Sequence, residues 1–317
     1  MPARFFTPDL TLQTQLEQIL DTVWETYPTL AQNQIALTWI TYRPPYRINT
    51  GGALSAEEFW EYQPEGISYR GVELVEPGKL VHLFYLVAVH VWLEQGMVQP
   101  AADTERALTS MIRGGSHDAA SYLVDVLSGV SSGPVLPEGP MTTWQSQRNI
   151  INRYFTQLGW PELRSINVNQ KTWQEGPYGR ERVSFGKTFE NRNRLTAEAI
   201  ARLLHSIIGG VSVTSPRSQS MMDLLQAQPE LSARIGLPTA ASPTIKSWQI
   251  TAINAQISHS IAYVEAKGIH PYLLTVLTEN AADAGTQDVV SLVNRLVFER
   301  SQLNFEAANA QLPTPNS

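Results

Sequence analysis

Apolar and polar residues alternate with two different periods along the chain, and the period changes near both ends. Residues 10–27 place apolar side chains three or four positions apart, which predicts an amphipathic helix that begins after Asp9 or Thr11. Strict alternation predicts strands in two groups, at residues 34–42 and 67–74 and again at residues 243–250, 257–265 and 272–279. A last helical pattern covers residues 287–303.

Between the two groups of strands, residues 79–210 carry mostly helical periodicity. After the helix that starts near residue 79, helices are predicted at residues 103–113, 118–127, 142–158 and 196–208, and another at residues 218–228 follows Gly209 and Gly210. This order predicts an α+β fold (an α/β sandwich) with an antiparallel sheet of about five strands, built from both chain ends around an inserted helical block. We expect one domain over residues 1–306, with a sheet part (1–75 and 236–306), a helical part (76–235) and a disordered tail at 307–317.

The most apolar stretch is residues 76–95, EPGKLVHLFYLVAVHVWLEQ. It is apolar on nearly every side, which is typical of a helix at the centre of a domain. Its first turn nevertheless carries Lys79 and His82, which are three positions apart and therefore share a face. Because uncompensated buried polar groups are costly, these two residues either line a pocket or form a well-paired core site, and Lys79 can also extend its amine to solvent.

Composition and charge narrow the function classes. The 317 residues are 43% hydrophobic with a formal net charge of -6, which favours neither nucleic acid nor an anionic membrane as a partner. A small molecule or a protein is the better expectation. The chain has no cysteine, so disulfides, thiolate metal sites and cysteine nucleophiles are excluded. The N-terminus lacks an apolar signal core and residues 80–93 are too few to span a bilayer, so we expect a soluble, cytoplasmic protein. The sequence does not indicate an oligomeric state.

Motifs for cofactors are lacking. The six histidines form no His-x-x-x-His pair, and no Asp-rich calcium loop or Gly-rich phosphate loop is present, so we predict neither a metal nor another cofactor. Ser116, His117 and Asp118 are adjacent, but neighbours in sequence point in different directions and do not make a catalytic triad by spacing alone.

Several segments in sequence order resemble one known family. PGKLVHLFYLVAVHVWLEQG is similar to the active-site helix of class A β-lactamase-like serine hydrolases, whose pattern is Pro-Ala-Ser-x-x-Lys followed by an apolar helix. Ser116-His117-Asp118 resembles the family's Ser-Asp-Asn turn, and TIKSWQ its Lys-Thr/Ser-Gly strand. ENRNRLTAEAIARLLHSI is similar to the helix after the family's Ω-loop, and residues 217–228 to the helix before the final strands. The resemblance covers roughly residues 35–303 and implies a β-lactamase/transpeptidase-like fold.

The same resemblance implies that the catalytic residues are replaced. The family's serine nucleophile falls on Lys79 and its lysine base on His82, so ordinary serine chemistry is excluded at this position. Ser116 keeps a hydroxyl, whereas Asp118 replaces an amide that orients substrate. Among the Ω-loop glutamates, counting back from the following helix favours Glu181 as the deacylation-type carboxylate.

The strand motif is kept only in part. Lys246 and Ser247 retain a cation and a hydroxyl suited to a substrate carboxylate, but Trp248 stands where the family has glycine. An indole at that position fills the cleft, forms its wall, or belongs to the core or a partner surface. Lys246 and Ser247 can equally be surface strand residues, and Ser116 a helix cap.

Three functions follow from these replacements. The favoured one is a non-catalytic relative whose basic cleft binds a carboxylate-bearing small molecule or peptide. The second is a hydrolase of amides or esters with rewired catalytic residues, in which Ser116 or Lys79 is the nucleophile. The third is a scaffold or interaction protein whose cleft is plugged by Trp248.

Overall fold

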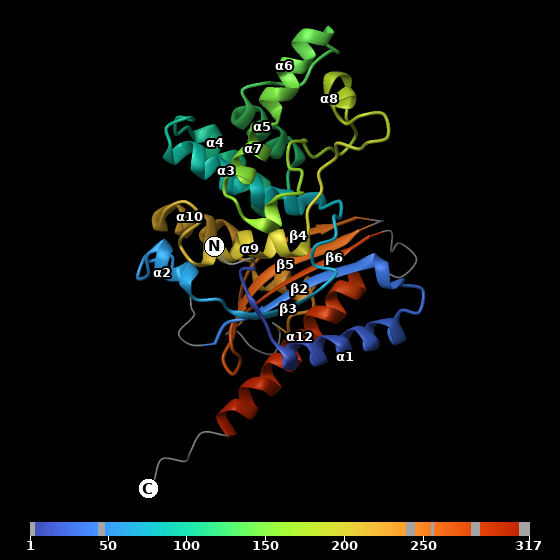
Figure 1. Ribbon diagram of the computed structural model, residues 1–317, viewed down its shortest axis with the longest axis vertical. Helices are drawn as coiled ribbons and strands as arrows, with labels where there is room; N and C mark the ends of the chain where they lie inside the picture. The colour runs from blue at the N-terminus through green and yellow to red at the C-terminus, as the bar shows by residue number, and fades with distance from the viewer. Residues whose placement is uncertain (1–3, 44–47, 239–244, 255–256, 280–285, 311–317) are drawn as a thin grey trace.

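A six-stranded sheet lies at the middle of the computed structural model, which describes residues 4–43, 48–238, 245–254, 257–279 and 286–310 (Figure 1). In this part of the chain the strands are arranged β1-β3-β2-β6-β5-β4. Their bounds are β1 Thr7–Pro8, β2 Ile35–Thr41, β3 Glu65–Tyr69, β4 Lys246–Ile253, β5 Ser258–Glu265 and β6 Tyr272–Thr278. The N-terminal and C-terminal strands meet where β2 pairs with β6. The predicted α+β class and the assembly of the sheet from both chain ends are therefore confirmed.

The sheet differs from the prediction in strand number and in one pairing. All neighbours are antiparallel except β1, which pairs in parallel with β3 through Thr7 and Pro8. The predicted count of about five strands missed β1, because a two-residue strand is too short to show alternation. The predicted strand at residues 67–74 instead ends at Tyr69, where Arg70 takes a left-handed conformation with φ 50°.

Helices cover both faces of the sheet, and the alternation of β2 shows how (Figure 1). Leu37 and Trp39 belong to the core cluster shared with α1 (Leu10–Thr26) and α12 (Thr286–Ala310). Ala36 and Ile40 point to the opposite face and join the larger cluster under the helical block. Both faces of the sheet carry buried apolar side chains, so the sheet is the middle layer between two layers of helices.

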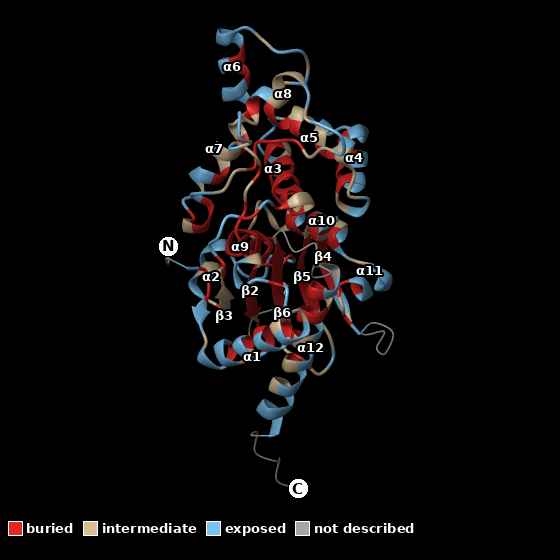
Figure 2. Cartoon of the chain, turned by 90° about the vertical axis from the view of Figure 1, so that its right-hand side faces the viewer, coloured by how far each residue is buried: buried red, intermediate tan, exposed pale blue. Residues whose placement is uncertain are grey.

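The helical block is built on α3 (His82–Glu94), which follows a 3-10 turn, η2 (Gly78–Val81). Residues from His82 to Trp92 of α3 are all buried, and Figure 2 shows α3 and α9 as buried along their lengths. The other helices of the block are α4 Ala102–Arg113, α5 His117–Ser128, α6 Glu138–Arg148, α7 Ile150–Gln157, α9 Ala197–Ile208 and α10 Ser215–Leu225. The central position predicted for residues 76–95 agrees with this burial.

Shorter elements and some boundaries differ from the pattern-based prediction. The helix predicted at residues 142–158 is two helices, α6 and α7, joined at Asn149. Three short helices and two 3-10 turns were not predicted: α2 Ala56–Glu61, α8 Gly179–Ser184, α11 Pro229–Arg234, η1 Gln32–Gln34 and η3 Pro161–Leu163. Helix α12 continues to Ala310, into the segment for which we predict disorder, and residues 311–317 lie outside the described part of the chain.

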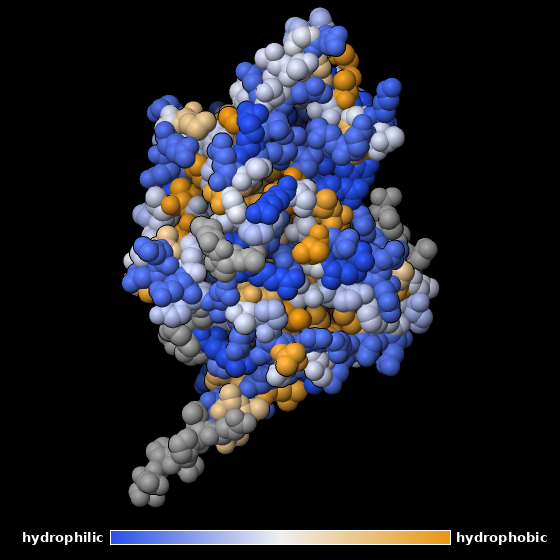
Figure 3. All heavy atoms as spheres, in the orientation of Figure 1, coloured by the Kyte–Doolittle hydropathy of each residue, from blue (hydrophilic) through white to orange (hydrophobic). Residues whose placement is uncertain are grey.

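The face of the molecule seen in Figure 3 is mostly polar, with apolar residues in small separate groups. No helix in the described part of the chain combines the length and the apolar character needed to cross a membrane.

Candidate functional site

A cavity of about 500 Å³ lies beside the start of the central helix. Segments distant in sequence meet there: η2, the first residue of α5, the loops around residues 171–177 and 185–193, and the end of β4. We call it the Lys79 cavity. Its lining residues are Glu76, Pro77, Gly78, Lys79, His117, Lys171, Thr172, Trp173, Gln174, Gly176, Pro177, Phe185, Phe189, Arg192, Asn193, Ala252, Ile253, Asn254 and Ile257.

Two glycines position the Lys79 side chain. Gly78 has φ 51°, and a Cβ there would lie 2.9 Å from Ile257 Cδ1 and 3.1 Å from Ala252 Cβ, so only glycine lets this turn approach the end of β4. The Lys79 chain passes Gly115, where a Cβ would lie 3.1 Å from its Cδ and 2.9 Å from its Nζ. The Gly115 backbone therefore packs directly against the Lys79 side chain, while Gly78 sets the turn from which that side chain starts. In the described part of the chain its ammonium has no hydrogen bond or ion pair.

The other cations at the cavity wall are already paired. Lys171 Nζ lies 2.7 Å from Asp125 Oδ2, and Arg192 Nη1 lies 2.6 Å from Glu76 Oε2. Among the described lysine and arginine residues of the lining, Lys79 is thus the one whose charge is not compensated.

His82 is the first residue of α3 and is only 1% exposed. Its Nε2 is 3.2 Å from the hydroxyl of Thr172, a residue of the cavity lining. Burial lowers the pKa of His82 to about 3, with a smaller effect from His117 and then from Lys79, opposed by the Met111 backbone. The imidazole is therefore neutral at physiological pH.

His117, rather than Ser116, lines the cavity. Helix α5 begins at His117, and the Ser116 hydroxyl accepts a hydrogen bond from the Ala119 N–H at 3.2 Å as its N-cap. Ser116 instead lines a separate hollow of about 260 Å³ between α4 and α5, and Asp118 is exposed. Successive residues at a helix start point in different directions, so the three adjacent side chains cannot share one cavity. Burial, and then the Lys79 charge, lower the pKa of His117, while Asp118 opposes the shift.

The structure does not bring Glu181 to the cavity. This carboxylate is fully buried, where its Oε1 accepts hydrogen bonds from Arg148 at 2.6 Å and from the Ser132 hydroxyl at 2.9 Å. Arg148 also lies 3.1 Å from Asp125. Glu181 therefore belongs to an ion cluster that joins α5, α6 and α8, where no substrate has access.

The segment Lys246-Ser247-Trp248 lies at the end of β4 that is remote from the Lys79 cavity. Lys246 is exposed and starts the strand, whereas the cavity is lined by Ala252, Ile253 and Asn254. Ala252 is six positions along the strand from Lys246, which corresponds to about 20 Å. Ser247 is buried against the Ser232 hydroxyl at 2.7 Å, and Trp248 packs on Tyr263 with ring centroids 5.6 Å apart. Trp248 is not among the residues that line the Lys79 cavity, so it does not plug it.

Several lining residues were not predicted from the sequence. They are the loop residues Thr172, Trp173, Phe185, Phe189, Arg192 and Asn193, and Asn254 at the end of β4. Most come from the stretch between α7 and α9, which has no sustained periodicity. The dense run of aromatic and cationic residues in that stretch was the available signal.

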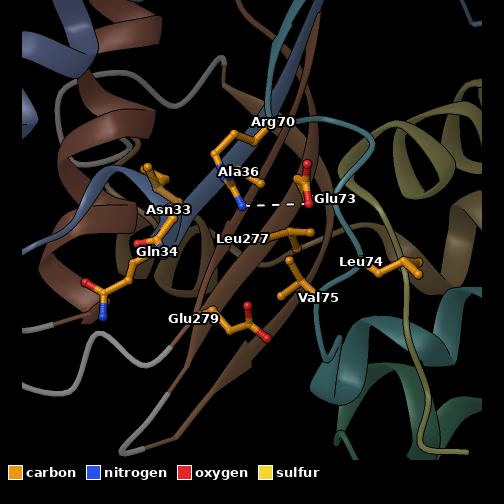
Figure 4. A pocket seen from close by; sticks show the side chains of 10 residues that line it. Asn33, Gln34, Ala36, Arg70, Glu73, Leu74, Val75, Leu277 and Glu279 are labelled. Atoms are coloured by element: carbon orange, nitrogen blue, oxygen red, sulfur yellow. Dashed lines mark ion pairs between the residues drawn. The ribbon is translucent and has the colours of Figure 1, made fainter. Parts of the chain in front are cut away.

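A second hollow, shown in Figure 4, is a poorer candidate. It measures about 90 Å³ and lies beside the start of β2 and the end of β6. Its charged residues are matched: Arg70 lies 3.8 Å from Glu73, and Glu279 lies 3.2 Å from Arg194. Both its small size and its paired charges leave the Lys79 cavity as the candidate site. Within the described ranges, no three His, Asp or Glu side chains are grouped to hold a metal ion.

Comparison with known proteins identifies the fold. A β-lactamase from Sphaerobacter thermophilus superposes with a TM-score of 0.62 at 14% identity, over 90% of this chain and 97% of that chain. A mutant of PBP-A, solved as an acyl-enzyme complex with penicillin G, gives 0.61 at 13% identity over 95% and 98%. A β-lactamase from Chitinophaga pinensis gives 0.56 at 10% identity over 92% and 100%. The chain has a β-lactamase-like fold.

Comparison of the sequence with models of protein families gives a match that agrees with this β-lactamase-like fold. The model of the family described as "Beta-lactamase enzyme family" matches residues 145–300, which include the cavity loops but neither Lys79 nor His117. No curated protein matches the chain. At identities of 10–14% the structural neighbours establish the fold and not the chemistry of the site.

Proposed function

We propose that this β-lactamase-like protein binds a carboxylate-bearing small molecule or peptide in the Lys79 cavity and does not hydrolyse it by serine chemistry. The uncompensated ammonium of Lys79 carries the proposal. A cation held in a concave site loses part of its hydration, and a carboxylate ligand restores that stabilisation through a charge-assisted hydrogen bond. The paired Lys171 and Arg192 contribute much less to such a ligand, because their charges are already satisfied.

The absence of a serine from the described lining supports the second half of the proposal. The resemblance of residues 77–96 to the active-site helix of serine hydrolases aligns Lys79 with the nucleophile and His82 with the base. An ammonium cannot form the ester intermediate of that chemistry. Thr172 is the one hydroxyl-bearing residue among the described lining residues.

Thr172 supplies a second candidate function, a hydrolase with rewired residues. Its hydroxyl lies 3.2 Å from His82 Nε2, within the range of a nucleophile and its base. In such a reaction the Thr172 oxygen would attack an ester or amide carbonyl, its proton would pass to His82, and the protonated leaving group would depart before water hydrolyses the acyl-threonine. An imidazole with a pKa of about 3 is a weak base for this step. We therefore rank ligand binding first.

Binding is tested by ligand-observed NMR titration with acetate and phenylacetate against the native protein and two variants. Lys79→Met removes the cavity cation, and Lys246→Met removes an exposed cation from the far end of β4 with the same change in net charge. We expect carboxylate affinity to fall by about tenfold or more in Lys79→Met, the equivalent of one charge-assisted hydrogen bond, and to stay within about twofold in Lys246→Met. Equal losses in both variants would show a nonspecific charge effect and overturn the proposal.

Hydrolysis is tested separately with a chromogenic β-lactam and an activated ester, followed by intact-mass and peptide mapping. We expect no turnover and no acyl adduct on Thr172, Ser116 or Lys79. Turnover that disappears in Thr172→Val, with the fold retained by circular dichroism, would instead establish the hydrolase.

A further inference from the structure

The Lys79 cavity has an aromatic wall in addition to its cation. Trp173, Phe185 and Phe189 all line it, and each of them is partly exposed. Apolar rings that face water in one concave site gain free energy when a ligand covers them. A small anion such as acetate would leave these three aromatic rings exposed to water.

The wall is held in place by its surroundings. The Phe189 ring has the Arg182 guanidinium 4.2 Å from its centroid and the Arg192 guanidinium at 5.3 Å. Arg192 is in turn paired with Glu76 beside η2. The Phe189 and Phe185 rings meet edge to face at 6.2 Å. Cation-π contacts and ring packing of this kind fix a ring before a ligand arrives.

Backbone conformation adds a second observation. Phe189 has φ 59°, a left-handed conformation that is unfavourable for a bulky side chain. Such strain persists where surrounding contacts over-determine it, and it concentrates at ligand clamps. Here the Phe189 carbonyl accepts hydrogen bonds from the Arg192 backbone N–H and from Arg192 Nε, both at 3.2 Å.

The Trp173 indole, in the other loop that lines the cavity, packs against backbone. A Cβ at Gly176 would lie 2.5 Å from Trp173 Cε3, so the glycine backbone packs directly on the indole. The Lys171 ammonium lies 6.0 Å from the centre of the same ring. Contacts within the protein thus hold both aromatic segments.

We infer that the ligand of this cavity is an aryl-substituted carboxylic acid, whose carboxylate meets Lys79 and whose ring lies against Trp173, Phe185 and Phe189. The inference rests on the proposed carboxylate binding at Lys79 and adds the chemical class of the rest of the ligand. Phe189 is then the specificity-determining residue, since its conformation is strained and its ring is fixed by two guanidinium groups.

Three probes separate the two parts of the ligand: phenylacetate, acetate and phenylacetamide. With the native protein we expect phenylacetate to bind about tenfold more tightly than acetate, a difference of about 1.4 kcal/mol, because its ring covers apolar side chains of the cavity. Phenylacetamide, which keeps the ring and lacks the charge, should bind more weakly than phenylacetate. Affinities are measured by ligand-observed NMR titration.

Variants test whether the preference for phenylacetate comes from the aromatic wall of the cavity. Phe189→Ala should reduce the preference for phenylacetate over acetate to within about threefold, and Trp173→Leu should reduce it in the same direction. Tyr122→Ala, which truncates an exposed aromatic residue outside the cavity, is the matched control and should keep the full preference. Circular dichroism and thermal melts confirm that each variant is folded.

The outcomes separate this inference from the proposed function. If acetate and phenylacetate bind equally and both depend on Lys79, the proposed carboxylate binding stands and the inference of an aryl ligand is overturned. If the preference for phenylacetate survives Phe189→Ala and Trp173→Leu in folded protein, the inference that these rings contact the ligand is likewise overturned. If phenylacetamide matches phenylacetate and Lys79→Met has no effect, the proposed function fails, and with it the inference that rests on it.

Discussion

Lys79 and His117 form a small electrostatic unit at the cavity wall. The pKa of His117 is lowered by burial and then by the Lys79 ammonium, so a positive charge on this imidazole is costly in the free protein. A bound carboxylate reverses this effect, because it compensates both charges at once. Anion binding and protonation of His117 are therefore linked.

This linkage predicts how carboxylate affinity depends on pH. The pKa of His117 is lowered in the free protein, so the imidazole is largely neutral at pH 8 and gains its proton as the pH falls. Acetate and phenylacetate should bind about threefold to tenfold more tightly at pH 5.5 than at pH 8, corresponding to roughly 1 kcal/mol from one added charge at the wall. The dissociation constant is measured by NMR titration at each pH.

Removing the imidazole gives the control for this pH effect. His117→Gln, which keeps polarity and approximate size, should show one affinity across the same range. If the pH dependence is unchanged in that variant, His117 is not its source.

At the scale of secondary-structure elements, the ion cluster around Glu181 links three helices. Glu181 comes from α8, Arg148 from α6 and Asp125 from α5, and Lys171 joins them from the cavity loop at 3.8 Å from Glu181. The resemblance implies a catalytic carboxylate here, whereas full burial and the contact with Arg148 favour a structural role.

The two interpretations of Glu181 give different results on substitution. Glu181→Gln leaves the buried Arg148 without its closest carboxylate and should lower the free energy of unfolding by about 3 kcal/mol. Carboxylate affinity at the Lys79 cavity should change much less, since Lys79 is not part of the cluster. Urea denaturation provides the measurement, and Glu138→Gln on the exposed side of α6 is the control. A variant with native stability would contradict the structural role.

Elements with long periodic patterns were predictable, and the site was predictable only where it coincided with them. Lys79 and His82 stand out because they interrupt an apolar helix, and the structure places both at the cavity or its wall. Lys246 to Trp248 lie away from the Lys79 cavity, and the sequence could not show this because alternation identifies β4 without telling which of its ends reaches the cavity. Phe189 was missed because a left-handed loop residue has no signature in a hydrophobic pattern.

At the scale of the whole molecule, four histidines lie in the interior as neutral groups. Burial lowers the pKa of His82 and His205 to about 3, and that of His90 and His259 to about 4. In the unfolded chain each has a pKa near 6.5, so between pH 6.5 and 4 the unfolded state binds more protons than the folded one. Their contribution to stability is therefore complete above pH 6.5 and is lost as the pH falls.

His90 isolates this effect most cleanly. Among the described residues neither of its ring nitrogens has a hydrogen-bond partner, and it lies on α3 at 4% exposure, so His90→Leu removes a titrating group without breaking a bond. Urea unfolding of the native protein at pH 8, 7, 6 and 5 should show the free energy of unfolding falling steeply below pH 6.5, by up to about 5 kcal/mol per pH unit when all four sites contribute. In His90→Leu the dependence of the free energy of unfolding on pH should be smaller by about 1.4 kcal/mol per pH unit, with equal or higher stability at pH 8.

His270→Gln is the control, because His270 is partly exposed, and it should leave this pH dependence closer to native. An unaltered slope in His90→Leu would mean that His90 is already protonated in the fold, and would contradict a dry, neutral environment at the centre of this helix.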